Sequence, residues 1–170
     1  MPLEILHRAA PRRNVPVTFT LDRWMCMADI SIVVDPASLK REPNGNVTGM
    51  LLLRGEAADF PAAAWFDFPV VVLGWWIAGL TKLSSGETRT FQGLFMDGPY
   101  AFTVRTGHGD EAQVAWGPRG KELLVGVTPI QNLLASAVRA GTVVAEACRA
   151  QDWRNSDIDQ LEHALARAAV

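Results

Sequence analysis

The sequence predicts an α+β fold, in which an antiparallel sheet packs against a buried central helix and two C-terminal helices. Three observations lead to this prediction. The longest apolar run, residues 67–83, has the length of one buried helix. After residue 86 the apolar residues recur with a period of two, and short glycine-rich turns divide this region into strands. From residue 128 onward they recur at steps of three and four, as in amphipathic helices that cover a sheet.

Composition narrows the class of protein. The 170 residues are 49% hydrophobic and 20% charged, which is typical of one globular domain that spans residues 1–170. The formal net charge of −2 gives no electrostatic reason to expect a nucleic-acid partner. Cys26 and Cys148 stand far apart, and charges interrupt the N-terminal stretch too often for a signal peptide. We therefore expect a cytoplasmic protein with reduced thiols.

The N-terminal third contributes strands to the predicted sheet. Apolar and polar residues alternate from Val17 to Asp22, which is the pattern of a half-buried strand. Pro36 ends a later strand, because proline lacks the backbone N–H that a sheet needs. We expect strands over residues 3–6, 17–27, 30–34 and 47–54.

Residues 67–83 are predicted to form the central helix. Asp67 is expected to cap its N-terminus, and Pro69 fits the first helical turn. No side chain from Pro69 to Leu80 is charged, so the helix is apolar on every side and has to be buried. The β-branched run at 70–73 also fits a strand, but the length and the polar ending of the segment favour a helix. Only about 12 residues follow Pro69, and about 18 Å of helix is too short for a bilayer core of about 30 Å.

Trp75 and Trp76 are adjacent on the central helix. Neighbouring side chains on a helix point about 100° apart, so the two indoles cannot face one surface. Either the helix is sandwiched between two layers with both indoles in the core, or one indole is available to a ligand or a partner. Of these alternatives, we expect both indoles in the core with their N–H groups hydrogen-bonded.

Four strands are predicted after residue 86, over residues 88–96, 100–106, 111–116 and 121–127. The segments between them are three or four residues long and contain glycine, as hairpins require. The four strands are therefore expected to form an antiparallel meander, with successive turns at opposite ends.

Two helices are predicted at the C-terminal end of the chain. Thr128 and Gln131 fit a capping box, with Pro129 as the first helical residue. Ser136 falls on the polar face of this helix, and its apolar stripe comprises Ile130, Leu133, Leu134, Ala137, Val138, Gly141, Val144, Ala145 and Cys148. Ser156, with Asp159 three residues later, is expected to open the last helix. Its stripe comprises Ile158, Leu161 and Leu165.

No catalytic or metal-binding motif stands out in the sequence. His108 precedes two carboxylates, Asp110 and Glu111, which together could bind a metal or exchange a proton, but acidic residues and glycine are also favoured by hairpin turns. The segment Met25-Cys26-Met27 offers sulfur ligands, but alternate residues of a strand point to opposite faces. We therefore assign no catalytic residue, no metal site and no cofactor, and we favour a protein that is not an enzyme.

One end of the predicted meander collects residue types that are common in protein interfaces. Asp97, Tyr100, Trp116 and Arg119 meet there, with Pro99 and Lys121 beside them. Tyrosine, tryptophan and arginine are over-represented among the residues that dominate binding energy. We predict that Asp97, Tyr100, Trp116 and Arg119 bind a partner, the alternative being that Tyr100 and Trp116 only cap the core.

In its size and in the general character of residues 65–76 and 95–100, the chain is similar to small bacterial immunity proteins of the kind found beside polymorphic toxins. The resemblance includes no diagnostic motif, so no functional residue is carried over from it. Our first hypothesis is a non-catalytic intracellular module that binds a protein partner, such as a toxin domain. The second is an enzyme or small-molecule binder with a pocket between the sheet and the Trp75/Trp76 helix. A homodimer that buries Trp76 or the long C-terminal helix is compatible with both.

Overall fold

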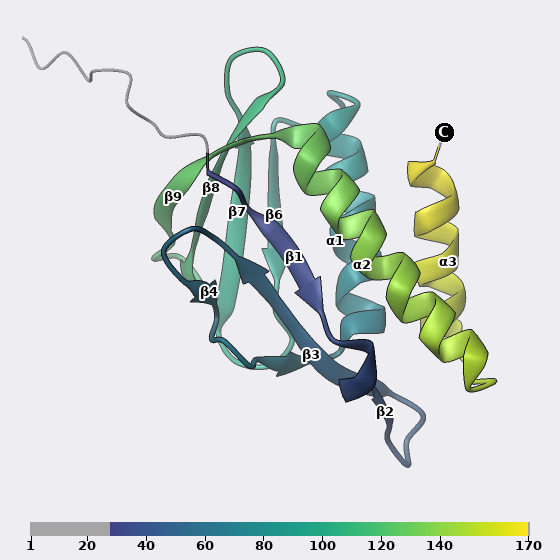
Figure 1. The fold of residues 1–170 in the computed structure, drawn as a ribbon. Coiled ribbons are helices and arrows are strands. Elements are labelled where there is room, and N and C mark those ends of the chain that lie inside the picture. Colours follow the sequence, from purple (N-terminus) through teal and green to yellow (C-terminus); the bar gives the residue numbers. More distant parts are fainter. Residues whose placement is uncertain (1–27, 170) are drawn as a thin grey trace, which may run out of the picture.

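The computed structural model describes residues 28–169 (Figure 1). A sheet with the order β1-β3-β2 includes two short strands, β4 and β5, that also pair with β3. These strands are β1 (Ser31–Val34), β2 (Lys40–Arg41), β3 (Val47–Arg54), β4 (Asp59–Phe60) and β5 (Phe66–Asp67), with a 3-10 helix, η1, at Pro36–Ser38. The strands expected at residues 3–6 and 17–27, with Met25-Cys26-Met27, lie outside the described residues.

The predicted meander is confirmed as a second sheet with the order β6-β7-β8-β9, antiparallel throughout. Its strands are β6 (Thr90–Leu94), β7 (Tyr100–Thr106), β8 (Glu111–Pro118) and β9 (Leu123–Pro129). The N-terminal strands form their own sheet beside it. The N–H of Ala28 donates to the carbonyl of Val127 at 2.8 Å, which connects the start of the described chain to β9.

Three helices complete the α+β fold: α1 (Pro69–Ser84), α2 (Ile130–Ala150) and α3 (Ser156–Ala168). Figure 1 shows α1 beside the strands, with α3 on the outside of the helical layer. α1 packs on β3, β6, α2 and α3, whereas α3 packs mainly on α1 and α2. Across residues 28–169, every helix is too short or too polar to cross a lipid bilayer.

The central segment is a helix, as predicted, but Asp67 is not its cap. The N-cap is Phe68, which has no side-chain capping bond. Asp67 lies in β5, is buried, and accepts N–H groups from Met96 and Asp97. The cap prediction is wrong because a buried carboxylate is best satisfied by several N–H donors, and here the β6–β7 turn supplies two of the four.

The expectation that both adjacent indoles lie in the core is wrong for one of them. Trp76 is fully buried, and its Nε1–H donates to the carbonyl of Leu94 at 3.1 Å. Trp75 is 49% exposed. Sheets, α2 and α3 surround most of α1 but leave open the side on which Trp75 and Ala78 lie.

The start of α2 also differs from the prediction. The strand pairing of β9 continues to Pro129, opposite Glu111, so Thr128 and Pro129 belong to the sheet and no capping box forms. The N–H of Ile130 finds its acceptor in the carbonyl of Asp110, at 2.9 Å, which replaces the expected cap.

Ser136 was expected on the polar face of α2 and is instead buried. Its Oγ accepts the N–H of Ile32 at 2.8 Å. Among the residues that the structure describes, β1 pairs only with β3, so its other edge has backbone groups that need partners. A polar residue on the inner side of α2 satisfies one of them.

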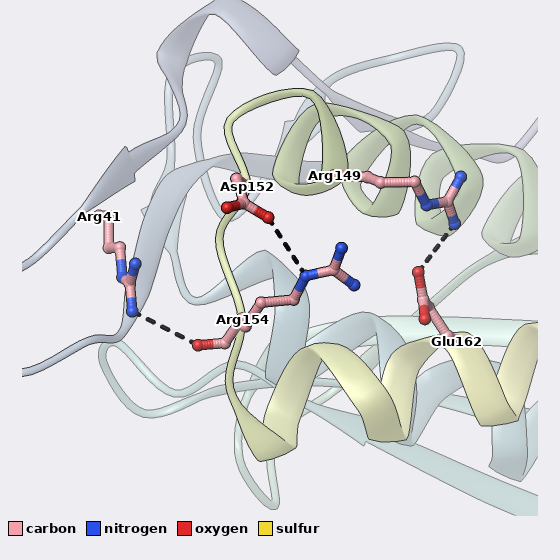
Figure 2. A network of polar contacts seen from close by, with 5 residues as sticks. All are labelled: Arg41, Arg149, Asp152, Arg154 and Glu162. Atoms are coloured by element: carbon pink, nitrogen blue, oxygen red, sulfur yellow. Dashed lines mark hydrogen bonds and ion pairs between the residues drawn. The ribbon is translucent and has the colours of Figure 1, made fainter.

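Polar contacts around the α2–α3 turn hold α3 in place (Figure 2). The N-cap of α3 is Asn155, one residue before the expected Ser156, and its side chain accepts the N–H of Ile158 at 2.8 Å. Its amide also donates to the carbonyl of Gly45 at 2.9 Å, which ties the turn to the β2–β3 hairpin. Figure 2 shows the ion pair between Arg149 and Glu162, at 2.8 Å, that joins α2 to α3.

Arg154 takes part in two further contacts in Figure 2. Its Nε lies 3.5 Å from the carboxylate of Asp152, and its carbonyl accepts from Arg41 of β2 at 3.4 Å. On α3, Ile158 and Leu161 are buried as expected, while Ala164 takes the buried place predicted for Leu165, which is half-buried.

Candidate functional site

The end of the meander that the sequence singled out is a real cluster in space. Tyr100 is paired with Pro118 across β7 and β8, and the N–H of Arg119 donates to the carbonyl of Pro99 at 2.8 Å. Trp116 is paired with Leu123 on β9. The turn at residues 107–110 lies at the opposite end of the same strands.

An aromatic cluster supports this end of the sheet. The ring of Tyr100 meets Trp65 edge-on at 5.1 Å and Phe60 edge-on at 5.7 Å. Trp116 stacks on Phe60 with ring centroids 5.5 Å apart. Tyr100 and Trp116 are half-buried, so each ring has one part in the cluster and another part open to solvent.

Arg119 and Asp97, the two charged residues at this end of the sheet, differ in their contacts. The guanidinium of Arg119 donates to the carbonyl of Phe95 at 2.9 Å, although the residue is exposed. Asp97 is also exposed, and its backbone N–H donates to Asp67 at 3.2 Å. Asp97 therefore contacts Asp67 through its backbone N–H and not through its carboxylate.

Asp67 fixes the β6–β7 turn under this surface. Its carboxylate accepts the N–H of Phe68 at 2.7 Å, of Met96 at 3.1 Å, and the indole N–H of Trp65 at 3.3 Å. Burial raises the pKa of Asp67 above its ordinary value, while these N–H donors act to lower it.

Exposed hydrophobic side chains surround the same end of the sheet. Of the six large hydrophobic residues that are exposed between residues 28 and 169, four lie here, with exposed fractions between 45% and 76%. They are Phe66, Met96, Leu123 and Leu124. Phe66 and Met96 flank the Asp67 contacts, and the two leucines pair with Trp116 and Ala115.

We define the sheet-end surface as these four residues together with Asp97, Tyr100, Trp116 and Arg119. The sequence interpretation missed its hydrophobic part. Consecutive leucines at 123 and 124 cannot both face the core of a regular strand, and this was the available signal. The register of β8 and β9 shifts between Val114 and Ala115, next to these leucines.

A second feature is a pocket of about 590 Å³ between α1 and α3, called here the α1–α3 pocket. Its lining comes from these helices and the residues that follow α1: Val70, Val71, Gly74, Trp75, Ala78, Thr81, Lys82, Ser85, Glu87, Asp157, Asp159, Gln160, His163, Ala164 and Arg167. The pocket therefore lies on the helical side of α1, and not between the sheet and α1 as our second hypothesis expected. The spacing of Trp75, Ala78 and Lys82 places them on one helical face, and a lysine on that face was a signal of exposure.

The α1–α3 pocket combines apolar walls with charged ends. Its volume lies in the range of known ligand pockets, roughly 300 to 1,000 Å³. Carboxylates and cations occur in it, and Lys82 lies 3.5 Å from Glu87. Within the part of the chain that the structure describes, no three histidine, cysteine, aspartate or glutamate side chains are grouped to hold a metal ion.

Comparisons with protein-family models, with curated proteins and with solved structures find no match to this chain. The sheet-end surface and the α1–α3 pocket are therefore the features from which function is inferred.

Proposed function

We propose that this protein is a non-catalytic module that binds another protein through the sheet-end surface. The observation that carries the proposal is the concentration of exposed hydrophobic side chains at this end, next to Asp97 and Arg119. Contiguous exposed apolar surface rimmed by polar residues is typical of protein interaction sites.

The composition of the surface supports a protein partner. Aromatic residues, methionine and arginine are enriched at the cores of protein interfaces, and Tyr100, Trp116, Met96 and Arg119 supply them. Such anchors contribute most of the binding energy in many complexes, while their neighbours exclude water.

The rigidity of the surface also supports binding. Asp67 holds the β6–β7 turn through two backbone N–H groups, and the aromatic cluster supports Tyr100 and Trp116 from behind. A surface that is already ordered loses little conformational entropy when a partner binds. The guanidinium of Arg119 and the backbone N–H of Asp97 are used in structural hydrogen bonds, which favours binding over chemistry.

A toxin domain is the partner that we propose, because the chain resembles small immunity proteins in size and texture. In such a pair the module would act by sequestering its partner.

Site-specific photocrosslinking tests this proposal. A photoreactive amino acid in place of Leu123 is expected to capture a defined partner in the native host, while the same residue at His108, at the opposite end, is expected not to capture it. With the purified partner, Arg119→Ala and Leu123→Ala should each weaken binding about tenfold or more, equivalent to about 1.4 kcal/mol. His108→Ala is the matched control. Equal capture from both positions, or unchanged affinity of both variants, would reject the sheet-end surface.

A further inference from the structure

We propose that the α1–α3 pocket is the interface of a twofold-symmetric homodimer, in which α1 and α3 lie antiparallel to the same helices of a second copy. Trp75 lies at the centre of this interface. The proposal is independent of the sheet-end surface, which lies on other elements and stays accessible for a different partner.

One side of the otherwise apolar helix α1 is exposed at the pocket. α1 has no charged residue before Lys82, and eight of its sixteen residues are buried. Trp75 and Ala78 are the exposed members of its apolar part, and both line the pocket. Tryptophan is one of the residue types enriched among the residues that dominate binding energy, and these cluster near the centre of interfaces, where a partner removes them from water.

α1 and α3 lie side by side along the pocket. Gly74 of α1 lies against Leu161 of α3, since a Cβ added to it would be 3.7 Å from the Cα of Leu161. Ile77 of α1 and both Leu161 and Leu165 of α3 approach Gly141 of α2, so the three helices meet there. Figure 1 shows α1 and α3 running in the same direction, with α2 running opposite to them.

Because the helices are parallel, the pocket has two chemically different ends. Asp157 and Asp159, in the first turn of α3, lie at the end where both helices begin. Lys82 and Arg167, in the last turns of α1 and α3, lie at the other end. The Nζ of Lys82 lies 3.5 Å from a carboxylate oxygen of Glu87. Arg167 is therefore the cation at this end that can pair with a carboxylate of a second copy.

This polarity selects one of two twofold arrangements. If the twofold axis ran along the helices, the acidic end would face the acidic end of the second copy. If the axis crosses the helices, Asp157 and Asp159 face Arg167 of the second copy, and the reciprocal contact forms at the other end. Symmetric interfaces require such self-complementary patches, and unlike charges fix orientation while like charges oppose it.

The position of the charges favours a second copy over a small ligand. From Val70 to Lys82 the pocket extends about 18 Å along α1, at about 1.5 Å per residue. A small ligand would have to span this length and carry opposite charges at its two ends to contact the whole pocket. A second copy uses the apolar centre and both ends at once.

Light scattering after gel filtration, over a range of concentrations, tests the dimer. The wild-type chain is expected to be dimeric, and Trp75→Ala and Arg167→Glu should each raise the dimer dissociation constant tenfold or more. Arg139→Glu, an exposed arginine on α2 that does not line the pocket, is the matched control and should leave it unchanged. Circular dichroism checks that every variant is folded.

A charge exchange makes the test specific for the antiparallel arrangement. Arg167→Glu alone and the double variant Asp157→Lys/Asp159→Lys should each be monomeric, whereas their equimolar mixture should form heterodimers. If the double variant does not fold, Trp75→Lys tests the same interface without changing α3. A wild-type monomer at all concentrations, or a dimer as insensitive to Arg167→Glu as to Arg139→Glu, would overturn the proposal.

Discussion

The carboxylate of Asp67 accepts the backbone N–H of Asp97 at 3.2 Å, across thirty positions of sequence. This contact joins the start of α1 to the β6–β7 turn, and so joins the central helix to the sheet-end surface. The acceptor, Asp67, is buried, and in such a setting both the making and the loss of a hydrogen bond affect stability more than they do at the surface.

The buried carboxylate of Asp67 should make the stability of the folded protein depend on pH. Burial raises its pKa in the folded state, so between its ordinary value of about 4 and the folded value, the folded protein binds the proton more readily than the unfolded chain. Its contribution to stability is therefore complete below about pH 4 and is lost as the pH rises through the folded pKa. Asp67→Asn cannot ionise and lacks this dependence. Denaturant unfolding of both proteins from pH 4 to 7 should show the stability of the wild type falling relative to the variant. If the wild type instead became more stable relative to the variant as the pH rises, the N–H donors would lower the pKa of Asp67 more than burial raises it.

The adjacent tryptophans should differ sharply in their effect on stability. Trp76→Ala removes a fully buried indole and its hydrogen bond to Leu94, which should cost about 3–5 kcal/mol of unfolding free energy. Trp75→Ala, measured at a concentration where the chain is monomeric, should cost less than about 1 kcal/mol. Urea unfolding of the two variants checks the contrast, and equal losses would show that Trp75 belongs to the core.

Ser136→Ala should destabilise the contact between α2 and β1. Without its Oγ the N–H of Ile32 stays buried and unpaired, at a cost of about 1–3 kcal/mol. Thr142→Ala, an exposed change on the same helix, serves as control and should stay within about 0.5 kcal/mol. Chemical denaturation of both variants measures the difference, and a Ser136→Ala variant as stable as the control would contradict the assignment.

The cap of α3 is tested by two neighbouring substitutions. Asn155→Ala removes the acceptor for Ile158 and the donor to Gly45, and should cost about 0.5–2 kcal/mol. Ser156→Ala, at the position that the sequence favoured as the cap, should change stability by less than about 0.5 kcal/mol. Thermal unfolding distinguishes the two, and the reverse order would place the cap at Ser156.

Local sequence patterns predicted the elements whose structure depends on near neighbours. The strand at 47–54 and the strand at 100–106 have the predicted bounds, because alternation and glycine turns are visible within a few residues. The patterns failed where a distant segment supplied the partner. Ser136 meets Ile32, and Ile130 meets Asp110, and no local signal announces either contact.

For the candidate functional surfaces too, local patterns predicted one part, and contacts between distant segments decided the rest. Hairpin geometry was enough to bring Tyr100, Trp116 and Arg119 to one end of the sheet. The exposure of Leu123 accompanies a register shift between β8 and β9 that lies close to it, and that of Trp75 depends on where α3 packs. Both are settled by the assembly of the whole chain.

The packing of α3 has a consequence for local unfolding. Because α3 packs mainly on α1 and α2 and is fastened by surface contacts such as Arg149–Glu162, it can detach without breaking the ladders of either sheet. Amide hydrogens in α3 should therefore exchange with deuterium sooner than those of Trp76 and its neighbours, through an opening that costs less than global unfolding. In a dimer of the kind proposed, the second copy would close this weakest part of the molecule, and exchange in α3 would slow as the protein is concentrated.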